Sequence, residues 1–207
     1  MDVEQTQRRQ RRDARENRQQ ILAAAKRLFA GQGVDRTSMH EIARSAGVGQ
    51  GTLYRHFADK GELCRALIKE DLAAFQERVG ALVSDTVTTP SPLARLDVLI
   101  AEKIELTESH LPMFAAIEDA ATGARRKKGF RGPFHAWLHE TIVALLAEAV
   151  ACGEVDTIDG PIVADVILAA TSPQLYSFER QDLLYSSERI AAAMRRLFVN
   201  GLRHVER

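Results

Sequence analysis

The chain has 207 residues, of which 45% are hydrophobic and 27% are charged, so it can bury one sizeable core or two small ones. This composition excludes an intrinsically disordered tail and a collagen-like fibre. No apolar run approaches the roughly 20 residues that a bilayer-spanning helix needs, and residues 1–20 are basic and polar where a secretory signal is apolar. We therefore expect a soluble cytoplasmic protein without a membrane partner.

The net charge is zero, with 28 basic and 28 acidic residues, but the two signs are unevenly distributed. Residues 1–60 contain 12 Lys or Arg and 7 Asp or Glu, whereas the remainder contains 16 and 21. A basic head on an acidic body favours a polyanion bound at one end only. A solvated charged face gives the same split, so the charge alone does not identify the partner.

Strand signals are nearly absent, and the periodicity predicts an all-α fold of about nine helices. A basic arm over residues 1–13 precedes a first helix, which we expect to begin at the capping pattern of Asp13 and Glu16 and to end at Gly31 and Gly33. The apolar stripe of this helix is Ile21, Leu22, Ala25, Leu28 and Phe29.

Two short helices follow, over residues 38–46 and 50–57, joined through Gly47 and Gly49. Ser38 and Glu41 repeat the capping pattern at the start of the first of them. This pair is a helix-turn-helix. Beyond it we expect longer helices over residues 60–83, 92–107, 112–122, 133–152, 161–170 and 187–203, several of them with Pro near the first position.

The helix over residues 50–57 presents a polar face away from its core. On a helical wheel, Leu53 and Phe57 mark the buried side, and Arg55 lies opposite them with Gly51 and Thr52 beside it. Because an exposed helical Gly costs roughly 1 kcal/mol relative to Ala, its presence indicates close approach by another molecule. The major groove of B-DNA admits such a helix, and Arg there can pair with guanine.

Phosphate contacts are predicted around this face. Tyr54, His56 and Lys60 flank it and can bond phosphates without reading sequence. We also expect the arginines of the arm to contact phosphates or the adjacent minor groove, although a disordered basic tail is an alternative. These arginines are Arg8, Arg9, Arg11, Arg12, Arg15 and Arg18.

Three segments resemble the DNA-binding domain of TetR/AcrR-type transcriptional regulators: residues 21–30 (ILAAAKRLFA), 37–43 (TSMHEIA) and 46–57 (AGVGQGTLYRHF). The resemblance covers about residues 14–63 and implies a homodimer in which the N-terminal helices bind a palindromic double-stranded operator. Gln50 departs from the Lys common at its position, and Gly49 replaces the usual capping Ser. The predicted DNA-binding residues are Thr37, Gln50, Gly51, Thr52, Tyr54, Arg55, His56 and Lys60.

The resemblance divides the chain into the arm (1–13), the helix-turn-helix domain (14–59) and an effector-binding and dimerisation domain (60–207). Aromatic residues concentrate in the middle of the last of these, which indicates an apolar ligand pocket, with plain core filling as the alternative. Thr141 lies on the aromatic face and needs a polar partner, either a backbone carbonyl one turn back or a ligand group. The predicted pocket is His110, Phe114, Phe134, Trp137, Leu138 and Thr141.

Other sites receive less support. His135 and His139 have a spacing that can bind Zn, but no third ligand is apparent, so we predict no metal and no cofactor. Cys64 and Cys152 lack a CxxC spacing and are read as inert thiols, with redox sensing as the alternative. The basic run 125–128 is read as a solvated loop, with a portal for an anionic ligand as the alternative.

The last two predicted helices carry apolar stripes and many alanines, which permits close packing between two copies of the chain. Packing within one chain is the alternative. The predicted dimer interface is Val166, Ile167, Ala170, Ile190, Met194, Leu197 and Phe198.

The sequence thus predicts a ligand-responsive transcriptional regulator, most simply a repressor that leaves its operator when a small hydrophobic effector binds. An enzyme with a site in the bundle core is a competing class, but no paired carboxylates or nucleophile with a base stand out, so we expect no catalysis. A nucleoid-type DNA-coating protein is a third class, and operator specificity separates it from the first.

Overall fold

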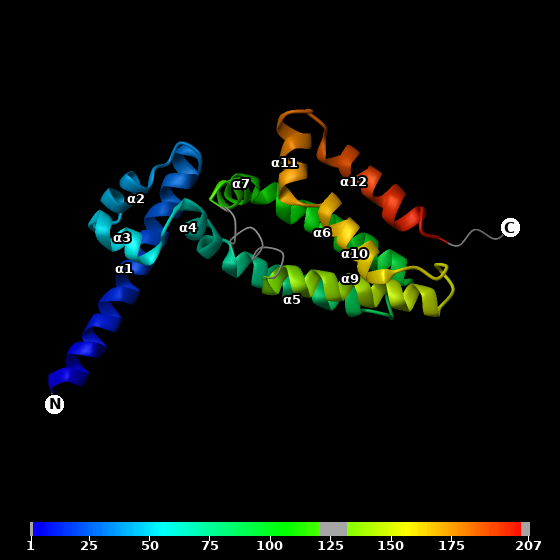
Figure 1. Cartoon of the computed structure of the whole chain (residues 1–207), viewed down its shortest axis with the longest axis horizontal. Coiled ribbons are helices and arrows are strands. Elements are labelled where there is room, and N and C mark those ends of the chain that lie inside the picture. The colour runs from blue at the N-terminus through cyan, green and yellow to red at the C-terminus, as the bar shows by residue number, and fades with distance from the viewer. Residues whose placement is uncertain (1, 121–131, 204–207) are drawn as a thin grey trace. The chain divides into compact units, whose positions relative to one another are not determined.

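The computed structural model describes residues 2–120 and 132–203, and Figure 1 shows the course of the chain. Within these ranges every regular element is a helix, and the one bridge, between Val155 and Arg203, is isolated, so the predicted all-α fold is confirmed. No helix within them is long and apolar enough to cross a bilayer. The chain divides into two compact units, Met1–Lys69 with Pro112–Ala121, and Glu70–Leu111 with Thr122–Arg207.

The N-terminal unit contains α1 (Asp2–Gln32), α2 (Met39–Ser45), α3 (Gln50–His56), α4 (Lys60–Leu67) and most of α7 (Leu111–Asp119). α1 begins 11 residues before the predicted start at Asp13. The prediction of a separate arm before the helix was wrong about local structure, because residues 2–20 contain no Gly or Pro and are rich in good helix formers. An ion pair of 3.5 Å between Arg12 and Glu16 lies on this extension.

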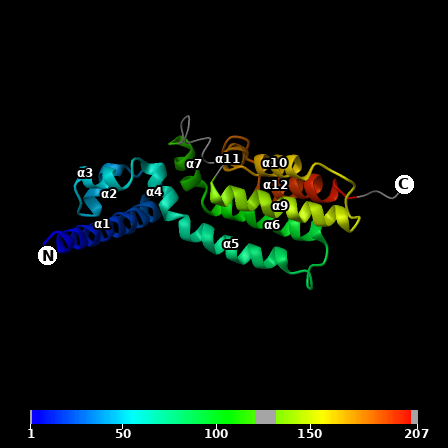
Figure 2. The ribbon, with the colours of Figure 1, turned by 60° about the horizontal axis from the view of Figure 1, so that its bottom comes forward.

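The second unit contains α5 (Lys69–Ser84), α6 (Pro92–Ser109), α9 (Pro133–Ala151), α10 (Gly160–Ala170), α11 (Pro173–Gln181) and α12 (Ser187–Arg195). In Figure 2, α5, α6 and α9 run alongside one another. α9 packs against both α6 and α10, and α12 packs against α6. The large core of this unit includes Phe75, Leu96, Ile142, Ile167 and Tyr176.

Beyond α2 and α3, the helices differ from the prediction in three main respects. The helix expected over residues 60–83 is interrupted at Ile68, although no Gly or Pro there predicts a break, and the first segment of the N-terminal unit ends one residue later. α11 was missed, although Ser172 caps it and Pro173 opens it, because its nine residues are too short for a clear period. The last predicted helix ends early, at Arg195, and a π-helical turn, η1 (Arg196–Asn200), follows.

A buried lysine lies in the core of the second unit. Lys103 on α6 is 7% exposed, and its Nζ donates a hydrogen bond to the carbonyl of Thr171, which caps the C-terminus of α10. Burial lowers the pKa of Lys103 from 10.5 to about 7.

Lys103 therefore makes the stability of the fold depend on pH. Because its folded-state pKa lies below the unfolded value, the unfolded chain binds more protons between about pH 7 and 10.5, and stability rises with pH across that window. We expect urea unfolding to show that the wild-type chain gains stability relative to Lys103→Met when the pH is raised from 7 to 10. Parallel profiles of the two proteins would show that Lys103 titrates normally.

Candidate nucleic-acid interface and effector cavity

The helix-turn-helix is held by one small core and one capping box. Ser38 Oγ accepts a hydrogen bond from the Glu41 N–H at 3.2 Å, and Glu41 Oε2 accepts one from the Ser38 N–H at 2.8 Å, which confirms the predicted cap. The Ser38 N–H and the Ser38 hydroxyl both donate to Glu41 Oε2 at 2.8 Å, and these two bonds hold the pKa of Glu41 below its usual value. Gly47, with φ +68°, makes the turn between α2 and α3. The core residues are Ile21, Ala25, Ile42, Ala43, Leu53, Phe57, Leu63 and Leu67.

α3 is oriented as the helical wheel predicts. Leu53 and Phe57 are buried, whereas Tyr54 and Arg55 are exposed. A Cβ atom added at Gly51 would meet no heavy atom within 4 Å, so the outer surface of the helix is open there. Arg55 Nη2 donates to Thr52 Oγ1 at 2.9 Å, which holds the guanidinium along the exposed face. The exposed face of α3 therefore carries the N–H donors of the Arg55 guanidinium and, at Gly51, a position without a side chain.

Two contacts to α3 were not predicted. The amide Nε2 of Gln50 hydrogen-bonds to Nδ1 of His40, so the first residue of α3 is tied to α2. The guanidinium of Arg18 on α1 lies over the ring of Phe57, 4.9 Å from its centroid. Neither contact leaves a periodic signal in the sequence, because each joins residues at least ten positions apart.

Thr37 and Lys60 are engaged within the N-terminal unit. Thr37 is 1% exposed, and its hydroxyl donates to the Gly33 carbonyl at 2.7 Å. Lys60 Nζ donates to the Val34 carbonyl at 2.7 Å and to the Asp35 carbonyl at 3.3 Å. Both side chains stabilise the connection between α1 and α2, and their DNA contacts stay predictions. His56, the last residue of α3, is partly buried.

The second unit contains a cavity of about 490 Å³ beside the only tryptophan. Trp137 and Thr141 of α9 line it together with Gly80 of α5. The hydroxyl of Thr141 donates to the Trp137 carbonyl at 2.7 Å, one turn back, which is the first of the two partners proposed from the sequence. The structure thus brings two of the six predicted pocket residues to one cavity.

The other predicted pocket residues lie elsewhere. Leu138 is 2% exposed within the core, and Phe134 packs edge-to-face on Phe75 with ring centroids 5.7 Å apart. His110 Nε2 lies 3.0 Å from Asp71 Oδ2, and Phe114 belongs to α7 in the N-terminal unit. Core filling therefore accounts for Leu138 and for much of the contact surface of Phe134.

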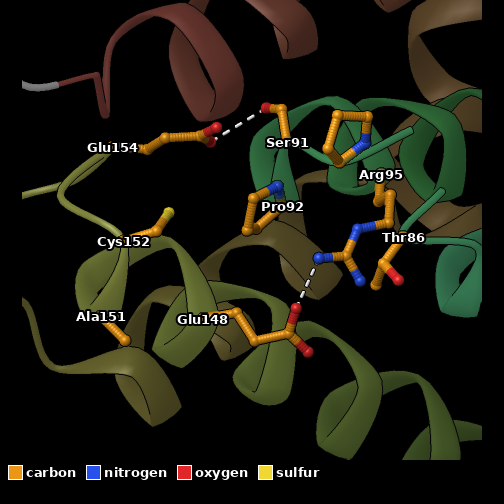
Figure 3. Close-up of a pocket in the computed structure, with 9 residues that line it drawn as sticks. Thr86, Ser91, Pro92, Arg95, Glu148, Ala151, Cys152 and Glu154 are labelled. Carbon is orange, nitrogen blue, oxygen red and sulfur yellow. Dashed lines mark hydrogen bonds and ion pairs between the residues drawn. The ribbon is translucent and has the colours of Figure 1, made fainter. Parts of the chain in front are cut away.

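A second cavity, of about 680 Å³, lies near the start of α6 (Figure 3). Cys152 and Arg95 line it, and Glu154 accepts hydrogen bonds there from Ser91 Oγ at 3.0 Å and from the Leu93 N–H at 3.1 Å. Sequence reasoning missed this cavity, because its walls come from the connection between α5 and α6 and from the end of α9.

The remaining candidates from the sequence are a histidine, two cysteines and a basic run. His139 Nε2 lies 3.5 Å from Asp165 Oδ1, and the described part of the chain holds no group of three residues able to bind a metal. Cys64 is buried, which raises the pKa of its thiol to about 11, whereas Cys152 is exposed. The basic run 125–128 lies outside the described residues.

The predicted dimer residues divide by exposure. Ile167, Ile190 and Met194 are buried in the core of their own chain, and Ala170 and Phe198 pack partly against it. Val166 and Leu197 are 50% and 60% exposed. Ile162, one turn before Val166, is 58% exposed and adds to the apolar surface of α10. Their role in a dimer stays a prediction.

Comparison with known proteins gives consistent matches. The bacterial regulatory proteins of the tetR family match over residues 21–67. The HTH-type transcriptional regulator SAR2658 of Staphylococcus aureus (strain MRSA252) is 32% identical over 170 residues, which cover 82% of this chain and 85% of that one.

Solved structures match along most of the chain. AibR, in complex with isovaleryl coenzyme A and operator DNA, has a TM-score of 0.59 at 25% identity, with 88% of this chain and 98% of that chain covered. The transcriptional regulator FadR from Bacillus subtilis, in complex with stearoyl-CoA, has a TM-score of 0.63 at 21% identity, with 89% and 99% covered. The fold of both units is therefore a known one.

Proposed function

Since the chain belongs to the TetR family of bacterial regulatory proteins, we propose that this DNA-binding regulator is a repressor that leaves its operator when a small effector binds the second unit. The observation that carries the proposal is the outer face of α3. On this face the exposed guanidinium of Arg55 bonds to Thr52, and Gly51 leaves the neighbouring surface without a side chain. On the opposite face, Leu53 and Phe57 are buried and anchor the helix to the core. A helix of this shape fits the major groove.

The proposed roles follow from what each side chain can donate. Arg55 pairs with guanine O6 and N7, and Thr52 contacts an adjacent base edge or thymine methyl. Gln50 lies at the start of α3, where its amide oxygen remains able to accept from a base. Tyr54, His56 and the arginines of α1 bind phosphates, which position the protein without reading sequence. Two such helices in a homodimer read the two halves of a palindrome.

The effector is proposed to be a molecule with an apolar body that lies beside Trp137. The cavity there is lined by Val83, Ala144 and Leu145 as well as the indole. AibR and FadR were solved with acyl-CoA molecules, which makes acyl compounds the first probes to try. Release follows from linkage: a ligand that binds the DNA-incompetent state more tightly lowers DNA affinity by the same factor.

Selection of duplexes from a random library, followed by competition at fixed salt, tests the function. We expect enrichment of one palindromic sequence bound at least about 1,000-fold more tightly than unrelated DNA. Addition of acyl compounds should then lower operator affinity. Equal binding of all duplexes would favour a DNA-coating protein instead, and turnover of an added compound would favour an enzyme.

A further inference from the structure

A buried arginine lines both of the cavities described above. The side chain of Arg95 on α6 is 4% exposed. Its Nη1 donates to the Val83 carbonyl at 2.9 Å, and its Nη2 donates to Glu148 Oε2 at 2.5 Å. Figure 3 shows this bond between the guanidinium and the carboxylate among the residues that line the cavity near the start of α6. A buried cation is thus neutralised by one contact to α9.

The hydrogen bonding of this guanidinium is incomplete. Nε of Arg95 is buried and has no hydrogen-bond partner among the described residues. Nε and Nη2 form one edge of the guanidinium, the edge that a carboxylate can bind with both of its oxygens. Glu148 reaches only Nη2 through one oxygen. Because an unpaired buried N–H is costly, a carboxylate that bound both donors would be favoured over Glu148.

The present partner is easy to displace. The side chain of Glu148 is 51% exposed, so its carboxylate can turn into solvent with little change in its hydration. The guanidinium of Arg95, by contrast, has already lost most of its hydration on burial. Exchange of one carboxylate for another leaves the charge of the site unchanged. An incoming anion therefore does not meet the usual cost of burying a charge without a partner.

The surroundings define what the rest of the ligand must be. Arg95, Glu148 and Thr86 line both cavities, and Trp137, Ala144 and Leu145 line the smaller one. A ligand anchored at Arg95 can therefore lay an apolar body against the indole. Glu154, which caps α6, makes the far side of the larger cavity unfavourable for an anion.

We propose that Arg95 is the anchor of the effector site and that the effector is an amphipathic carboxylate, which displaces Glu148 and places its apolar body beside Trp137. This inference rests on the proposed function only in taking the second unit as the effector-binding part. It adds two points to that function. The effector is a free carboxylate on an apolar body, and Glu148 competes with this carboxylate for the guanidinium of Arg95. Simple charge attraction predicts stronger binding of an anion when any carboxylate that lines the cavity is neutralised, whereas the competitor confines this gain to Glu148.

Titration of the DNA-free protein with decanoate and with decan-1-ol tests the site, with Trp137 emission and calorimetry as readouts. We expect decanoate to bind about 10-fold or more tightly than the alcohol, because only the acid can use both donors. Glu148→Gln should raise the affinity for decanoate and leave that for decanol unchanged. Arg95→Gln should remove the preference for the acid.

Glu140→Gln is the matched control, because Glu140 also lines the smaller cavity but does not hydrogen-bond to the guanidinium in the described part of the chain. This variant should leave the ratio of the two affinities unchanged. Equal binding of acid and alcohol by the wild-type protein would overturn the proposal, as would weaker decanoate binding by Glu148→Gln. If Arg95→Gln does not fold, Glu148→Gln carries the test alone. Decanoate that binds at Arg95 without lowering operator affinity would refute the release mechanism and leave the site standing.

Discussion

Arg55→Ala is expected to remove the preference of the protein for its operator, at a cost of about 1–3 kcal/mol of discrimination at the base pair that this side chain reads. The guanidinium is exposed and is held by Thr52 Oγ1 at 2.9 Å, so little conformational freedom is lost when it enters the groove. The core beneath α3 does not include Arg55, and the variant should therefore fold normally. Competition shift assays with the selected operator and with an operator changed at single base pairs measure the effect.

Two controls separate base reading from general attraction. Arg203→Ala removes an equal charge from the second unit and should leave operator preference unaltered. Deletion of residues 2–12 removes four arginines from α1, so it should weaken binding to every duplex and flatten the dependence of log K on log salt. If Arg55→Ala behaves like the deletion, weakening all duplexes equally, Arg55 is a phosphate contact and the bases are read by another side chain.

The orientation of α3 could be predicted because it depends on residues close together in sequence. The spacing of Leu53 and Phe57 fixes the buried side of a short helix, and everything opposite must then be exposed. The capping box of Ser38 and Glu41 is equally local. By contrast, the bond between His40 and Gln50 spans two helices and depends on their crossing, which no local pattern encodes.

Contacts between distant segments also explain what the sequence did not reveal in the second unit. Trp137 and Thr141 could be placed at a cavity, because they share one helical face. Arg95 and Glu148 could not, since they are 53 residues apart and each looks like an ordinary exposed charge on its own helix. The break at Ile68 is of the same kind, because it lies where the two compact units divide and not at a helix-breaking residue.

Exposure decides which of the apolar residues near the C-terminus can be tested as a dimer interface. Ile167, Ile190 and Met194 are buried in their own chain, so their replacement would damage the fold. Val166 and Leu197 are at least half exposed, and a charge there leaves the core intact. An apolar surface of this kind indicates contact with another molecule, and a second copy is the partner that the proposed palindromic operator requires.

The double substitution Val166→Glu with Leu197→Glu is therefore expected to convert the proposed dimer to monomers and to weaken operator binding by about 100-fold or more, because each monomer contacts only half a site. Sedimentation velocity measures the first effect, and shift assays measure the second. Leu184→Glu is the matched control, since Leu184 is apolar and 80% exposed but lies in the connection between α11 and α12. A double variant that still sediments as a dimer would place the interface on another face, whereas monomers that keep full operator affinity would show that one helix-turn-helix is sufficient.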